Sequence, residues 1–358
     1  MTTLGELDAD PHPAYTRLRE REPVSWLPDA GQWLVTRWHD VRTVLCDTER
    51  FSSEHPGIHD VFRAAYQPGL TRDEVDTIAR PIARKAADDL FAAGGAELTG
   101  DYFEEVAAVA GATLLGLGVG CVDTLRHWGN RLALATNGRA DNEAVAAMAR
   151  DPEAIAIVDR LRRRPDDSLV ARLVHANLDA DTDSVPLLRH LAVSTLEPGW
   201  LAAWTLAALW TDHDQLTAAR EHRQLLGAAV YEALRWGGPV GVLTRRTTRA
   251  VTLGGKQIPP GDTLAVAVAS ANRDEVSFPE PHRFDLHRDV RPHLGFGIGP
   301  HHCPAYPMVI AIACTALDVL FDRMPDLGPA PGWQPKPRGW RLRLPGPLDA
   351  VWSLHRFS

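Results

Sequence analysis

A glycine-rich segment that ends in a cysteine most constrains what this chain can fold into. It reads His293-Leu-Gly-Phe-Gly-Ile-Gly-Pro-His-His-Cys303, and an apolar stretch at about residues 308–321 follows it. Its three glycines let the backbone fold tightly and approach a flat ligand closely. The apolar stretch predicts a buried helix, and amides at a helix N-terminus favour the anionic form of a nearby thiol. The segment therefore predicts a thiolate of the kind that serves as an axial ligand of haem iron.

Two other uses of this cysteine stay open from the residues alone. Cys303 could be a buried free thiol after a glycine-rich loop, or it could bind zinc together with His301 and His302. Zinc is poorly supported, because adjacent residues rarely share one tetrahedron and the chain has no Cys-x-x-Cys pair.

Charge and cysteine usage narrow the class of protein. The chain has 358 residues and a formal net charge of -8, and no basic face is evident, so we expect no nucleic-acid partner. Its hydrophobic share of 45% is enough for a sizeable core. The four cysteines are scattered without a paired framework, which indicates a reducing compartment.

Two segments bear on membranes and secretion. Residues 1–12 lack the apolar run of a secretion signal. The most apolar long stretch, residues 191–210, holds Glu197 and Pro198 near its middle, so it predicts a buried helix rather than a membrane span. We therefore expect a cytoplasmic protein with no membrane contact.

Hydrophobic periodicity predicts a mainly α fold with small β-sheets, in one domain over residues 1–358. Within residues 72–235, apolar side chains recur at helical spacing. Asp166 and Asp167 predict an N-cap for a helix at 168–174. Short β-rich runs separated by turn residues predict strands at 23–27, 32–36, 242–248, 251–253 and 264–269.

The motifs resemble those of the cytochrome P450 family in its actinobacterial form, from the Trp33 region to the C-terminus. Phe296-Gly-x-Gly-x-His-x-Cys303 resembles the family's cysteine-ligand loop. Glu232-Ala-Leu-Arg235 matches its Glu-x-x-Arg, and residues three apart share a helix face. Pro281-His-Arg283-Phe284 matches the motif whose arginine joins that pair in the family. The resemblance implies a P450-like haem-thiolate fold with haem b ligated by Cys303, and a structural triad of Glu232, Arg235 and Arg283.

The resemblance also implies how the haem is held. Buried propionates are costly unless several donors converge on them. His59 and Arg63 match the family's His-x-x-x-Arg, and Arg245 opens a strand where the family places a propionate arginine. The implied cofactor-binding residues are His59, Arg63, Arg245, His293, Phe296, His301 and Cys303, with Arg63, Arg245 and His301 the strongest.

The first departure from the family lies in the long central helix. Ser194-Thr195-Leu196-Glu197-Pro198 stands where the family has Ala-Gly-x-acid-Thr, whose threonine helps to deliver protons to dioxygen. The acid is kept as Glu197, whose pKa should rise if it is buried near haem. Proline should kink the helix and free the carbonyl of Ser194. We expect Glu197, Pro198 and Thr195 to bear on catalysis, although Pro198 could be only an architectural kink.

Further departures from the family affect the lid over the substrate pocket and the docking of an electron donor. Only five residues separate Ser53 from His59, and residues 128–166 are also short for the family, which implies shortened lid regions unless other segments close the gap. Such a lid would admit a bulky or carrier-bound substrate. Cys303-Pro-Ala305 lacks the family's following glycine and arginine, which weakens the case for an ordinary ferredoxin electron donor.

The resemblance implies an oxidoreductase acting on a small organic or carrier-bound molecule in specialised metabolism. With the alcohol replaced by Pro198, a peroxide-driven or other atypical oxidation gains weight. The alternatives are a non-catalytic helper that stabilises a partner enzyme and a haem-based binding protein. The expected substrate-pocket residues are Leu196, Glu197, Trp200, Val240 and Val242, with Leu348 and Asp349 as weaker candidates.

Overall fold

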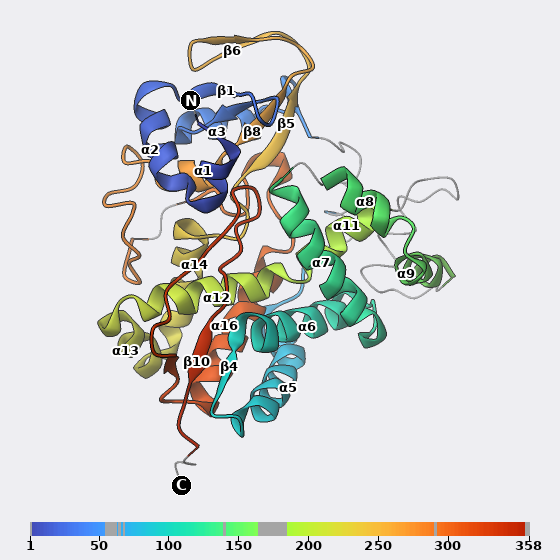
Figure 1. Cartoon of the computed structure of the whole chain (residues 1–358), viewed down its shortest axis with the longest axis vertical. Coiled ribbons are helices and arrows are strands. Elements are labelled where there is room, and N and C mark those ends of the chain that lie inside the picture. The colour runs from blue at the N-terminus through green and yellow to red at the C-terminus, as the bar shows by residue number, and fades with distance from the viewer. Residues whose placement is uncertain are drawn as a thin grey trace.

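The computed structural model describes residues 2–53, 63, 66, 69–138, 141–163, 185–289 and 292–354. These residues form a mainly helical protein with small sheets, as the sequence predicts (Figure 1). The helices are α1 Leu4–Ala9, α2 Pro11–Arg21, α3 Trp38–Cys46, α5 Arg72–Phe91, α6 Glu105–Leu115, α7 Val122–Thr136, α8 Asp141–Met148, α9 Pro152–Arg163, α11 Val185–Ser194, α12 Glu197–Trp210, α13 His213–Glu221, α14 Leu226–Trp236, α15 Val268–Ala271 and α16 Tyr306–Arg323, with a π-helix η1 at Thr99–Glu104.

The main sheet has five strands in the order β1-β2-β8-β5-β3. The predicted hairpin near the N-terminus is confirmed, because β1 and β2 pair in antiparallel register with Trp26 opposite Trp33. The pairing of β2 with β8 is parallel, and β5 is antiparallel to both of its neighbours. These strands are β1 Val24–Leu27, β2 Gln32–Val35, β3 Phe51–Ser52, β5 Leu243–Thr247 and β8 Thr263–Val266.

Two smaller sheets complete the described part. β6 Val251–Leu253 and β7 Lys256–Ile258 form a hairpin, and β4 Gly95–Glu97 pairs with β10 Asp349–Val351, which pairs with β9 Gly328–Pro329. Sequence reasoning missed β3, β4, β7, β9 and β10. Strands of two or three residues show no alternation, and β4 is defined only by its pairing with a segment some 250 residues later.

Helices α12 and α16 form the centre of the helical part. α12 packs against α6, α14 and α16, and α16 packs against α5 (Figure 1). α12 is apolar on nearly every face, and residues from Pro198 to Leu209 are buried. Such a helix must be surrounded by other elements. Glu197 begins α12 and Cys303 shortly precedes α16, so each lies at the start of one of these two central helices.

The single helix predicted over residues 191–210 is wrong in one respect. α11 ends at Ser194 and α12 begins at Glu197, so the chain breaks at Thr195 and Leu196. Pro198 lies in the first turn of α12, where its missing N–H costs nothing. The amides of Gly199 and Trp200 both donate to the carbonyl of Leu196. The predicted kink is therefore a complete break that precedes the proline.

Two further expectations meet the limits of the described residues. The predicted helix at 168–174 lies outside them, as does the short segment before His59. None of the helices in the described part of the chain is long and apolar enough to cross a membrane.

Candidate functional site

The cysteine loop closes on itself through its backbone. The amide of Cys303 donates to the carbonyl of Phe296 at 2.9 Å, and the amide of His302 donates to the carbonyl of Gly299 at 3.1 Å. Gly299 has a φ of +74° and lies against α3, where a Cβ would come within 3.3 Å of the Cα of Cys46. A residue with a side chain fits poorly here on both counts. The geometry of the loop therefore favours glycine at position 299.

The sulfur of Cys303 faces the start of α16. The backbone amides of Ala305 and Tyr306 donate toward it and act to lower its pKa, as expected for a helix N-terminus. Burial, followed by the charge of Glu197, outweighs them and raises the pKa of the Cys303 thiol to about 12. Without a metal the thiol is thus protonated at neutral pH, whereas a coordinating metal ion deprotonates it.

Glu197 approaches the same region from α12. Burial raises the pKa of its carboxyl to about 7. The side chains of Glu197 and Cys303 are both half-buried, so each keeps part of its surface accessible. The buried Tyr66 lies within reach of both charges, and burial is the main cause that raises the pKa of its phenol. Sequence reasoning missed Tyr66, which lies only three residues after the predicted cofactor-binding residue Arg63.

The cations expected at the propionates are only partly described. Arg245 is buried on β5, with Nη1 donating to the carbonyl of Thr244 at 2.8 Å. Arg63 is exposed and lies near His302, whose pKa is lowered by burial and then by the charge of Arg63. His301 is half-buried in a short 3₁₀ turn of the cysteine loop. His59 lies outside the described residues.

The predicted cofactor-binding residue His293 is buried and uncharged. Its ring lies against Tyr231, with centroids 4.1 Å apart, and its Nδ1 accepts from the amide of Gly295 at 3.1 Å. Burial, followed by the charge of Arg235, lowers the pKa of His293 to about 3. The imidazole is therefore neutral at physiological pH. Its buried Nε2 has no hydrogen-bond partner within the described residues, so it can still donate to a bound group.

The residues around the missing threonine have distinct surroundings. Thr195 is buried, and its hydroxyl donates to the carbonyls of Leu191 and Ala192 at 3.0 and 3.2 Å. Its methyl group lies against Gly111 of α6. The structure therefore turns Thr195 toward α6 and its own helix rather than presenting its hydroxyl beside Glu197. Pro198 is buried in the first turn of α12.

The substrate pocket stays a prediction, and its expected members have the following surroundings. Leu196 is buried and packs closely on Gly129 of α7. Trp200 is also fully buried, and its indole N–H is taken up by Glu104. Val240 forms an isolated bridge with Leu342.

The remaining pocket candidates lie in other parts of the described structure. Val242 packs in a cluster with the N-terminal helices and β2, and its place in the pocket stays a prediction. Leu348 packs in the core beside α16, and its amide donates to Glu97 at 2.7 Å. Asp349 is exposed on β10. Asp349 pairs with Glu97 in the β10–β4 ladder, which sequence reasoning missed.

The predicted ion pair is present, but its third member is another arginine. Glu232 and Arg235 are both buried and joined by two hydrogen bonds of 2.7 Å. Arg288 donates to Glu232 at 2.9 Å, whereas the side chain of Arg283 is largely exposed and reaches only Glu280, at 3.9 Å. Arg283 contributes its backbone carbonyl to Arg235 and Arg288. The prediction of Arg283 is therefore wrong at the level of the side chain, because the loop turns it outward.

These features fit an iron-bound flat cofactor better than zinc. Cys303 has amide donors around its sulfur, remains partly accessible and lies close enough to Glu197 for the charge of that carboxyl to raise the pKa of the thiol, after burial. Among the residues that the structure describes, no cluster of three His, Cys, Asp or Glu side chains could hold a metal ion by itself. A single thiolate is the protein donor set that haem iron requires.

Comparisons with known proteins agree with this site. A sequence model of the family described as Cytochrome P450 matches residues 209–308, which include the buried ion pair and the cysteine loop. The mycinamicin IV hydroxylase/epoxidase of Micromonospora griseorubida is 31% identical over 94% of this chain and 94% of its own length. The P450 monooxygenase PikC of Streptomyces venezuelae is 32% identical over 92% of this chain and 88% of its own.

The chain belongs to the cytochrome P450 family. Solved structures agree on the P450 fold: one of CYP109E1 from Bacillus megaterium in complex with testosterone has a TM-score of 0.84 and 22% identity, covering 98% of this chain and 100% of the other. The hydroxylase HmtN of himastatin biosynthesis has a TM-score of 0.78 and 23% identity, covering 99% and 100%. This P450 is accordingly an oxidoreductase whose cofactor is haem ligated by a cysteine thiolate.

Proposed function

We propose that this P450 is a monooxygenase of specialised metabolism that oxidises a small organic or carrier-bound molecule, with Cys303 as the iron ligand. The observation that carries the proposal is the placement of the Cys303 sulfur, which faces the amides of Ala305 and Tyr306 and lies within reach of Glu197. Bound haem supplies the oxidising chemistry, because a thiolate ligand donates electron density to iron and favours cleavage of an O–O bond.

The chain's own cations would hold the propionates. We assign this role to Arg63, Arg245 and His301, with His293 as a neutral donor through Nε2. Arg245 is buried, and a buried guanidinium stabilises a carboxylate more strongly than an exposed one, because water screens it less. His59 remains a predicted member of the set.

Glu197 is the acid–base group of the proposal. Its carboxyl pKa of about 7 allows it to hold and release a proton near neutral pH, which is the range that general acid–base catalysis requires. No hydroxyl follows it, because Pro198 occupies the alcohol position and Thr195 is turned toward α6. We therefore propose that the ratio of peroxide-driven oxidation to oxidation driven by dioxygen and a reduced ferredoxin is higher in this protein than in relatives that keep the threonine.

The names of the relatives support a specialised metabolite as the substrate. Beside the mycinamicin IV hydroxylase/epoxidase, the cyclomarin C epoxidase of Salinispora arenicola is 29% identical over 86% of this chain and 87% of its own length. A carrier-bound substrate is supported by the fold alone: P450BioI, solved with an acyl-ligated acyl carrier protein, has a TM-score of 0.79 and 20% identity, covering 98% of this chain and 100% of the other.

The proposal is tested with the haem-loaded protein and a panel of free and carrier-linked specialised metabolites. A binding partner is first identified by a substrate-induced shift of the haem absorbance. Turnover is then driven by peroxide, or by a ferredoxin, its reductase and dioxygen. We expect a product that has gained one oxygen atom, detected by mass spectrometry with isotopically labelled oxidant. A bound substrate that is unchanged under both oxidants would contradict a monooxygenase.

A further inference from the structure

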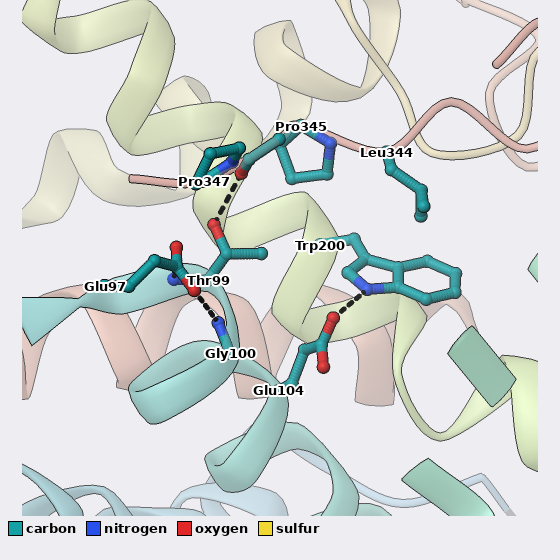
Figure 2. A pocket seen from close by; sticks show the side chains of 9 residues that line it. Glu97, Thr99, Gly100, Glu104, Trp200, Leu344, Pro345 and Pro347 are labelled. Carbon is teal, nitrogen blue, oxygen red and sulfur yellow. Dashed lines mark hydrogen bonds between the residues drawn. The ribbon is translucent and has the colours of Figure 1, made fainter. Parts of the chain in front are cut away.

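A small pocket lies beside α12, between η1 and the C-terminal segment at residues 344–347. It has a volume of about 190 Å³, and Glu97, Glu104 and Trp200 are among its lining residues (Figure 2). Two carboxyl groups in one pocket suggest a cation site at first sight. Glu97, however, already accepts the amides of Thr99, Gly100 and Leu348 at 2.7–2.8 Å. Its acceptor capacity is taken up by the chain itself.

Glu104 is likewise engaged, and its partners lie on two other helices. Its Oε1 accepts the indole N–H of Trp200 on α12 at 2.8 Å, as Figure 2 shows. Its Oε2 accepts the side-chain amide of Asn130 on α7, also at 2.8 Å. Glu104 is only 7% exposed, and Trp200 is fully buried. Hydrogen bonds between a carboxyl group and donors in such surroundings are strong and costly to break.

Because the chain breaks between α11 and α12, the position of α12 depends on this contact more than the position of an uninterrupted helix would. α11 ends at Ser194, so the direction of the first turn of α12 is not set by a continuous hydrogen-bond ladder. Tertiary contacts set this direction instead, and two of them lie in the first turn of α12. Gly199 crosses η1 so closely that a Cβ would lie 2.4 Å from the carbonyl oxygen of Phe103. The Trp200–Glu104 hydrogen bond then sets the rotation of the turn at that crossing.

We propose that Glu104 is a positioning residue that, through Trp200, holds Glu197 in its orientation toward Cys303. Glu197 and Trp200 are three residues apart in the first turn of α12. A rotation of this turn about the helix axis therefore moves both the indole and the carboxyl group. Asn130 holds the other oxygen of Glu104 and so prevents Glu104 from following the indole. The inference rests on the proposed acid–base role of Glu197.

The chain offers a matched pair of tryptophans for the test. Trp200→Phe removes the N–H that binds Glu104 and keeps most of the ring. Trp204→Phe removes an equivalent bond, since Trp204 lies one turn later on α12 and donates to the carbonyl of Arg343 at 2.9 Å. Both variants lose one buried hydrogen bond from one helix, so a purely structural effect should be similar in the two.

We expect kcat of the haem-loaded Trp200→Phe protein to fall about tenfold while KM changes by less than about twofold, since a misaimed proton donor affects the chemical step more than binding. Both constants should stay within about twofold of the parent in Trp204→Phe. Glu104→Gln, compared with Glu105→Gln, should reproduce part of the loss. Glu105 is the matched carboxyl because it pairs with Arg126 at the surface rather than with α12.

A second readout does not depend on turnover. The infrared band of the protonated Glu197 carboxyl, assigned by its disappearance in Glu197→Gln, should shift in Trp200→Phe and stay in place in Trp204→Phe. An unshifted band in Trp200→Phe would overturn the positioning role even if the protein oxidises no substrate offered. Equal kinetic losses in the two tryptophan variants would also overturn it, because the effect would then be loss of packing alone.

Discussion

The backbone amide of Cys303 donates to the carbonyl of Phe296 at 2.9 Å, and this bond closes the loop that presents the sulfur. The two residues are seven positions apart, and the turn between them passes close against α3 at Gly299. The sulfur is left facing the amides at the start of α16. The proposed iron ligand is thus placed by backbone geometry rather than by contacts of its own side chain.

Substituting Gly299 should weaken haem binding. Gly299→Ala and Gly255→Ala both force alanine into a positive φ, at a cost of about 1–2 kcal/mol each. Only at Gly299 does the new Cβ also meet α3, at 3.3 Å from the Cα of Cys46, whereas Gly255 has open space. We expect Gly299→Ala to lose haem during dialysis and Gly255→Ala to keep it. Equal retention by both variants would count against the close approach.

The buried ion pair predicts unequal roles for two neighbouring arginines. Arg288→Ala removes a partner of the buried Glu232 and should lower the free energy of unfolding by about 3 kcal/mol. Arg283→Ala removes only an exposed contact at 3.9 Å and should cost less than about 0.5 kcal/mol. Denaturant unfolding of both variants measures the difference. If Arg283→Ala is the more damaging, the side-chain arrangement described above is incorrect.

The raised pKa of Glu197 predicts a pH-dependent gain in stability on its removal. Burial favours the protonated form, so the folded protein loses stability as pH rises from the ordinary value of 4.5 to about 7. Glu197→Gln lacks this penalty and should be more stable than the parent by up to about 3 kcal/mol above pH 7, with no such advantage near pH 4. A stability difference that is the same at pH 4.5 and pH 8 would show that Glu197 titrates normally.

Restoring an alcohol beside Glu197 should change how oxidant is used. Pro198 occupies the first turn of α12, so Pro198→Thr loses no hydrogen bond and should leave stability within about 1 kcal/mol of the parent. We expect the variant to form more product per dioxygen consumed with a ferredoxin donor, relative to peroxide-driven turnover. Unchanged oxygen use and peroxide turnover would mean that the proline is architectural only.

The sequence predicts those parts of the site that local motifs determine. The Glu232–Arg235 pair and the order of the cysteine loop follow from residues a few positions apart, whose geometry the backbone limits. The N-terminal hairpin follows in the same way, since its alternation and its turn residues lie within fifteen positions.

Features that depend on distant packing could not be predicted in the same way. Nothing in the motif shows that its loop turns Arg283 outward and brings in Arg288 instead. The burial of Val242 against the N-terminal helices, and the pairing of β10 with β4, are set by segments far away in the chain. The thiol pKa illustrates the same limit: the helix N-terminus is visible in the sequence, but the burial of Cys303 that outweighs it is not.

The most direct test of the account is the absorbance spectrum of the haem-loaded protein, reduced under carbon monoxide. We predict the band characteristic of thiolate ligation in the parent and in Cys46→Ser, which changes an exposed cysteine. Cys303→Ser should lose that band. A parent protein that stays colourless after haem is supplied, or a Cys303→Ser variant with the parent's spectrum, would contradict Cys303 as the iron ligand.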